Sequence, residues 1–241
     1  MNFILEVIGF NIDSCLKAQE AGANRIELCA SPAEGGTTPS YGFIRAACEK
    51  LQIPVYPIIR PRGGDFIVTE EEFNIMLSDI RISKELGSRG VVIGMLQTNG
   101  SIDKQRCQIL VEAAYPMGVT FHRAFDRVKD PVQALEDIIE IGCVRILSSG
   151  LQPTAMEGAE TLYQLNQQSN GRIIIMPGSG VRSNNIVELA QKTGATEFHS
   201  SARINIASQM NYTNMNMQEN LTALNVDQEE IKNIIGHLKQ L

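Results

Sequence analysis

The sequence predicts an α/β fold: a (β/α)₈ TIM-like barrel that occupies residues 1–241 as a single domain. Eight short apolar runs alternate with helical segments at nearly regular spacing, which is the pattern of parallel βαβ units. A length of 241 residues is usual for a barrel of eight such units. A doubly wound open sheet is the alternative, but no GxGxxG motif follows the first apolar run, which makes it the weaker one.

Each expected element has a local signal. The strands are short runs rich in β-branched residues, expected at 3–8, 25–29, 53–59, 90–94, 119–122, 144–147, 172–176 and 196–199. Thr69 and Glu72 form a capping box, and Asp130 precedes Pro131 at a first helical position. The expected helices cover 12–21, 40–51, 69–87, 101–114, a segment from 130, then 154–167, 183–192 and 227–241.

One segment lacks a regular period. Residues 200–226 are rich in Asn, Met and Gln. We expect a long loop between the eighth strand and the C-terminal helix, lying over the mouth of the barrel.

Composition excludes several classes of function. The net charge is −6, and the 21 Lys and Arg residues are scattered, so no nucleic-acid partner is expected. No apolar run approaches the roughly 18 residues of a membrane span, and no signal peptide is recognisable. Five widely spaced cysteines argue against a disulfide framework. These observations predict a cytoplasmic protein.

The third strand runs into a loop of unusual chemistry. The apolar run 53–59 is followed directly by Arg60, Arg62 and Asp65, with Gly63-Gly64 between them. Glycines allow the backbone to approach a ligand closely, and guanidinium groups offer forked donors to an anion. The loop is therefore a candidate anion-binding site, with a Gly-rich turn carrying solvated arginines as the alternative.

The alternation of side chains along the strands predicts charge inside the barrel. Apolar residues such as Ile26 and Leu28 should face the helices, which turns polar residues of the same strands inward. A polar plug low in the barrel is one possible role for Arg25, Arg145 and Glu197. Carboxylate and imidazole groups in one confined space suit general acid and base catalysis. The candidate catalytic residues are Glu6, Glu27, His122 and His199.

Loops that follow the strands supply candidate substrate-binding groups. Arg123 and Asp126 follow the fifth strand and join Asp65 as orienting groups. Hydroxyls and backbone N–H groups after the last three strands suit phosphate or carboxylate, although Gly and Ser are also ordinary turn residues. These residues are Ser149, Gly178, Gly180 and Ser200.

Five segments of the chain form long and specific motifs: NRIELC (24–29), EGGTTPS (34–40), IRPRGGDF (59–66), VTFHRAFD (119–126) and ATEFHSSA (195–202). In these segments the chain resembles the CutC family of copper homeostasis proteins. The resemblance implies a TIM-like barrel, a cytoplasmic location, a link to copper tolerance and copper binding. It also permits a homo-oligomer, as do exposed apolar positions on the helices.

Cu(I) prefers soft ligands, Cys and Met, arranged close together. The sequence has no CxxC or MxxM motif. Cys29 is the one cysteine expected at the functional end of a strand, and it is the candidate copper ligand. The other four cysteines are expected to be small apolar fillers. The methionines of the 200–226 segment are possible additional ligands: Met210, Met215 and Met217.

Two interpretations of function remain open. The first is a copper homeostasis protein that binds or buffers the metal. The second is a metal-independent barrel enzyme acting on a small anionic or phosphorylated molecule, with Glu27 or His122 as base and Arg60 and Arg62 around the anion. A Cu(II) or Zn site from Glu27, His122 and His199 lacks any local spacing signature.

Overall fold

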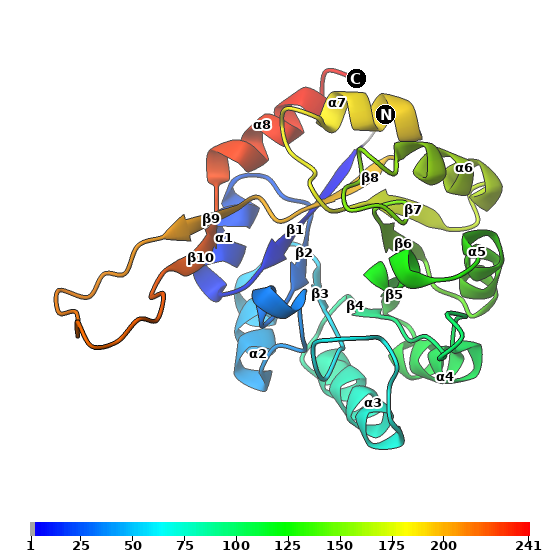
Figure 1. Cartoon of the computed structure of the whole chain (residues 1–241), viewed down its shortest axis with the longest axis horizontal. Helices are drawn as coiled ribbons and strands as arrows, with labels where there is room; N and C mark the ends of the chain where they lie inside the picture. Colours follow the sequence, from blue (N-terminus) through cyan, green and yellow to red (C-terminus); the bar gives the residue numbers. More distant parts are fainter. Residues whose placement is uncertain (1–2) are drawn as a thin grey trace.

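The computed structural model of the chain describes residues 3–241 and has the predicted fold class (Figure 1). Eight parallel strands surround one axis and helices form an outer ring. The strands are β1 (Ile4–Gly9), β2 (Arg25–Leu28), β3 (Val55–Pro57), β4 (Gly90–Ile93), β5 (Gly118–Phe121), β6 (Arg145–Ser148), β7 (Ile174–Pro177) and β8 (Glu197–Ser200). The helices are α1 (Ile12–Glu20), α2 (Tyr41–Lys50), α3 (Glu70–Glu85), α4 (Lys104–Ala114), α5 (Pro131–Glu140), α6 (Ala159–Ser169), α7 (Ile186–Thr193) and α8 (Gln228–Leu238).

The hydrogen-bond ladder around the barrel is interrupted at two places. The strands form two four-stranded sheets, β3-β2-β1-β8 and β4-β5-β6-β7. A single bridge between Ile58 and Val92 joins them on one side. On the other side β7 and β8 lie side by side, but within residues 3–241 no ladder connects them. The eight strands therefore do not form one continuously hydrogen-bonded sheet, as a fully closed barrel would. Pro57 in β3 and Pro177 in β7 lack the N–H that would extend a ladder.

Helix starts follow the local capping chemistry. The Thr69 hydroxyl accepts from the Glu72 N–H at 3.2 Å, and Glu72 accepts from the Thr69 N–H at 2.9 Å, as the capping box predicts. Asp130 caps α5 ahead of Pro131. Three helices begin later than predicted, at residues 104, 159 and 186. In the first of these, Asp103 accepts from the Arg106 N–H and so sets the start.

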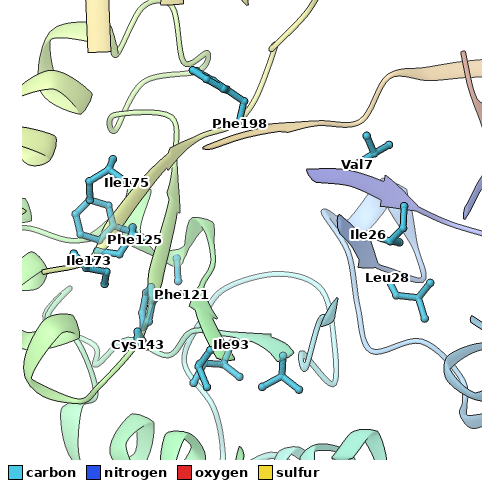
Figure 2. Close-up of a cluster of buried hydrophobic side chains, with 14 of the residues drawn as sticks. Val7, Ile26, Leu28, Ile93, Phe121, Phe125, Cys143, Ile173, Ile175 and Phe198 are labelled. Carbon is cyan, nitrogen blue, oxygen red and sulfur yellow. The ribbon is translucent and has the colours of Figure 1, made fainter. Parts of the chain in front are cut away.

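The apolar core lies between the strands and the helices. Ile26 and Leu28 on β2 and Phe121 on β5 are fully buried and belong to one continuous cluster. Figure 2 shows part of this cluster, which also includes Phe198 on β8. Because the apolar side chains pack on the helices, the alternate positions of the same strands face the barrel interior.

The segment after β8 does not cover the barrel. It forms an antiparallel hairpin of β9 (Arg203–Ile206) and β10 (Ala223–Val226), which projects beyond the ring of helices in Figure 1. Asn225 Nδ2 donates to Asp13 Oδ2 at 2.6 Å, which fixes β10 to the side of α1. The prediction of a loop over the mouth is therefore wrong, because contacts with α1 direct the segment sideways. The hairpin methionines are all exposed: Met210, Met215 and Met217.

None of the helices in the described chain combines the length and the apolarity that a bilayer span requires.

Candidate active site

A pocket of about 870 Å³ opens at the carboxyl ends of the strands. Residues from loops after most of the strands line it, as is usual for barrels of this type. Among the predicted site residues, it is lined by Glu27, Cys29, Arg60, Asp65, His122, Arg123, Asp126, Gly180 and His199.

His199 lies between two carboxylates at the floor of this pocket. Its Nδ1 is 2.8 Å from Glu6 Oε1, and its Nε2 is 3.6 Å from Glu27 Oε2. The strand order explains the contact, since β1 lies between β2 and β8 and the register places Glu6 beside His199. All three side chains are almost completely buried, but Glu6 lies beneath the pocket and does not line it.

Charge and burial divide the three groups into different protonation states. Burial raises the pKa of Glu6, but the Arg25 charge and the His199 hydrogen bond outweigh it and lower that pKa to about 2. Burial lowers the pKa of His199, but Glu27 and Glu6 together raise it above its ordinary value. Burial raises the pKa of Glu27 to about 7 against the opposing charge of His199. Glu27 and His199 are therefore able to exchange a proton near neutral pH.

His122 is a neutral hydrogen-bond donor. Its Nδ1 accepts from the Ala124 N–H at 3.2 Å, which assigns the proton to Nε2. Burial, followed by the charge of Arg60, lowers the pKa of His122 to about 3. Nε2 is buried without a hydrogen-bond partner among residues 3–241. Because His122 lines the pocket, this N–H is available to a ligand oxygen.

Arg60 places a buried positive charge in the pocket wall. Its guanidinium donates to the carbonyl oxygens of Glu34 at 2.7 Å, Gly36 at 2.9 Å and Gly64 at 2.7 Å. It also lies 4.9 Å from the ring centroid of Phe66. No acidic side chain in the described residues forms an ion pair with it. Arg60 thus connects the loops after β2 and β3, and its charge has no ion-pair partner among the described residues.

The loop after β6 is already occupied by an internal carboxylate. Asp126 accepts from Ser148 Oγ at 2.6 Å, from the Ser149 N–H at 3.0 Å and from the Leu151 N–H at 3.2 Å. Arg123 adds an ion pair at 2.7 Å. Ser149 therefore donates hydrogen bonds to Asp126 and does not line the pocket.

Three other predicted ligand-binding residues also lie outside the pocket lining. Arg62 points along the surface and bonds to Glu72 at 2.6 Å and to Asp65 at 3.1 Å. Gly178 packs beneath His199, where an added Cβ would lie 2.4 Å from Leu147. The Ser200 hydroxyl donates to the Val181 carbonyl within the loops.

A polar cluster fills the barrel interior below the pocket. Arg25 bonds to Glu6 and, at 2.7 Å, to Glu197, which also accepts from Arg145 at 2.6 Å. The Tyr56 ring lies beneath both guanidiniums, 5.3 and 5.8 Å from them. The charges of these residues balance, and none of them lines the pocket. The cluster therefore matches the polar plug that the sequence analysis gave as a possible role for Arg25, Arg145 and Glu197.

Sequence reasoning missed three arginines that line the pocket: Arg127, Arg182 and Arg203. Each follows the end of a strand by a few residues, as Arg60 does. That spacing was the available signal. For Arg203 the signal is weaker, because this residue lies in the segment 200–226, which lacks a regular period.

Cys29 lines the pocket but lacks the surroundings of a metal site. Burial, followed by the charge of Glu27, raises the pKa of its thiol well above the ordinary value. Within residues 3–241, no group of three or more His, Cys, Asp and Glu side chains is arranged to hold a metal ion. The exposed methionines of the hairpin do not reach the pocket. The side chains of residues 3–241 that line the pocket therefore do not form a copper cage.

The fold and the site define a class: a (β/α)₈ barrel with a pocket and a buried cluster of carboxylate and imidazole groups at the carboxyl ends of its strands. Residues 3–204 match the profile described as the CutC family. The chain belongs to the CutC family. Much of the β9–β10 hairpin lies beyond the matched residues.

The relatives agree with this assignment. A family protein CutC of Chromobacterium violaceum is 50% identical over 212 residues, covering 88% of this chain and 86% of the relative. The human copper homeostasis protein cutC homolog is 44% identical over 212 residues, covering 88% and 78%. The crystal structure of the copper homeostasis protein CutC from Streptococcus agalactiae has a TM-score of 0.79 at 34% identity and covers 83% and 98% of the two chains.

Proposed function

We propose that this chain takes part in copper homeostasis, as the names of its relatives indicate, by acid–base chemistry on a small anionic molecule in the barrel pocket. The observation that carries the proposal is the position of His199 between Glu6 and Glu27. A buried imidazole with one ionised and one readily protonated carboxylate suits proton transfer near neutral pH.

Each group in the pocket has a distinct task in this proposal. Glu27 accepts a proton from the bound molecule or returns one to it, and His199 exchanges that proton with Glu27. Glu6 is a positioning residue that keeps His199 oriented and favours its charged form. His122 donates Nε2–H to a ligand oxygen on which negative charge develops. Arg60, which forms no ion pair in the described chain, favours an anion.

The supporting test is a thermal-shift screen of small anionic metabolites, followed by turnover assays on those that bind. We expect a hit whose turnover is lost in Glu27→Gln and His199→Asn while its binding is retained. Arg45→Ala, an exposed change on α2, is the matched control. Full turnover in both pocket variants would contradict the acid–base assignment.

Direct binding of Cu(I) as a cargo at Cys29 is the second candidate. Its supporting observation is that Cys29 is the one cysteine in the pocket lining within the described chain. It ranks second because Cu(I) prefers a thiolate with further soft ligands, and burial beside Glu27 disfavours the thiolate. Anaerobic titration against a competing chelator tests it: tight stoichiometric binding lost in Cys29→Ser would place copper first.

A cytoplasmic location and a homo-oligomer complete the proposal. All five cysteines are free, in line with a reducing compartment. The exposed apolar side chains of the hairpin, such as Tyr212 and Met215, offer a surface for a second copy. Light scattering of the full chain and of a chain shortened in the hairpin tests the oligomer, since only the full chain should self-associate.

A further inference from the structure

Three successive backbone N–H groups of pocket-wall residues have no hydrogen-bond partner in the described part of the chain. They belong to Ser179, Gly180 and Val181 in the loop after β7, and all three residues line the pocket. Within residues 3–241, no oxygen accepts a hydrogen bond from these groups, whereas the flanking Gly178 N–H donates to the Ser148 carbonyl and the Arg182 N–H to Asn185. Unused donors gathered in a pocket wall are available to an acceptor on a ligand.

Two unpaired arginines lie on the same side of the pocket. Arg182 follows the three free N–H groups directly, and Arg203 follows β8, the strand beside β7. In the described part of the chain, neither guanidinium takes part in an ion pair or a hydrogen bond. The protein as a whole carries a net charge of −6. Positive charge left uncompensated in an acidic protein points to an anionic ligand.

The loop after β6 shows which kind of group such donors bind. In the loop after β6, N–H and hydroxyl groups of residues 148–151 surround the carboxylate of Asp126, and Arg123 lies beside it. The loop after β7 has the same kinds of donor, namely N–H groups and a guanidinium, but no carboxylate of the protein among the described residues bonds to them. The comparison indicates an anion brought by the ligand.

We propose that the loops after β7 and β8 bind the phosphoryl group of a small phosphorylated metabolite. Three N–H groups and two guanidiniums suit the three terminal oxygens and the double charge of a phosphate monoester better than a carboxylate with two oxygens. The inference rests on the proposed function, since a phosphoryl group held here leaves the rest of the molecule beside His199, which belongs to β8. Arg182, Arg203 and the three N–H groups are thus binding groups, and Glu27 and His199 carry the chemistry.

Calorimetric titration tests the proposal with three probes: ribose 5-phosphate, ribose and inorganic phosphate. We expect ribose 5-phosphate to bind and ribose not to bind. Binding of inorganic phosphate as well would show that the phosphoryl group alone is recognised, and its absence beside ribose 5-phosphate binding would show that an ester is required. The double variant Arg182→Ala, Arg203→Ala should weaken phosphate-dependent binding at least about tenfold, the effect of about 1.4 kcal/mol. Arg45→Ala should leave it unchanged.

A second measurement does not depend on a variant folding correctly. Titration of ¹⁵N-labelled protein with ribose 5-phosphate should shift the amide resonances of residues 179–181 and leave the Leu151 amide, which already donates to Asp126, nearly unmoved. Absence of binding by both phosphate probes would overturn the subsite, as would binding that survives the double arginine variant. Glu27→Gln should still bind ribose 5-phosphate, so failure of the acid–base function and failure of the subsite give different results.

Discussion

Nε2 of His199 lies 3.6 Å from Oε2 of Glu27, in an almost fully buried site at the floor of the barrel pocket. The contact joins two residues whose pKa values are both raised, Glu27 chiefly by burial and His199 by the two carboxylates despite its burial. A single proton shared by such a pair is available for transfer at neutral pH, and the first three predictions depend on this arrangement.

Replacing Glu27 by Gln should make stability less dependent on pH. The folded-state pKa of Glu27 is raised from 4.5 to about 7, so the stability it contributes is complete below pH 4.5 and is lost as pH rises through 7. Relative to wild type, Glu27→Gln should therefore gain up to about 3 kcal/mol in unfolding free energy between pH 5 and pH 8. Urea unfolding at the two pH values measures the gain. An equal difference at both would contradict the raised pKa.

The pocket histidines should titrate differently. Burial keeps the pKa of His122 at about 3, so its ring should show no protonation between pH 8 and pH 5, whereas His199 should gain a proton above pH 6.5. Proton–carbon NMR of the ring Cε1 groups measures both, and His237→Gln assigns the third histidine. A His122 signal that moves with a midpoint near 6.5 would remove its role as a neutral donor.

Glu6 supports both the pocket and the polar plug beneath it. Glu6→Gln removes one of the two carboxylates beside Arg25 and one of the two beside His199, and we expect a loss of about 3 kcal/mol in unfolding free energy because the buried cluster is left with an excess positive charge. The pKa of His199 should fall in the same variant. Glu49→Gln, which breaks an exposed ion pair with Arg45, is the control and should cost less than about 1 kcal/mol. Similar losses in the two variants would contradict the structural role of Glu6.

The projecting part of the hairpin should be dispensable for folding of the barrel. Ile206 is paired with Ala223, so replacing residues 207–222 by Asn-Gly closes the two strands with a tight turn. Because the removed side chains are exposed, we expect unfolding free energy to change by less than about 1 kcal/mol. Binding of ribose 5-phosphate should also be unchanged. A large loss of stability would show that these residues pack on the barrel.

Residues with a local signal were predictable. The alternation along β1, β2 and β8 places Glu6, Glu27 and His199 inside the barrel whatever the loops do, because successive side chains of a strand point to opposite faces. The capping box at Thr69 is equally local, since both of its hydrogen bonds join residues three positions apart.

Features that depend on distant contacts were not predictable. Nothing near Arg62 in the sequence shows that its side chain points outward while that of Arg60 points inward. Arg60 is held in place by carbonyl oxygens of the loop after β2 and of Gly64. The segment 200–226 was expected over the pocket. Instead, Asn225 donates to Asp13, 212 residues away, and this contact holds β10 against α1.

The sequence by itself therefore determined the barrel class, its family and the inward charges of the strands, because periodicity and capping act over a few residues. Only the tertiary structure decided the protonation states of Glu27 and His122, the pairing of Asp126 with the loop after β6, and the unpaired donors after β7. These properties depend on burial and on the acceptors within hydrogen-bond reach, and both come from parts of the chain that are far apart in sequence.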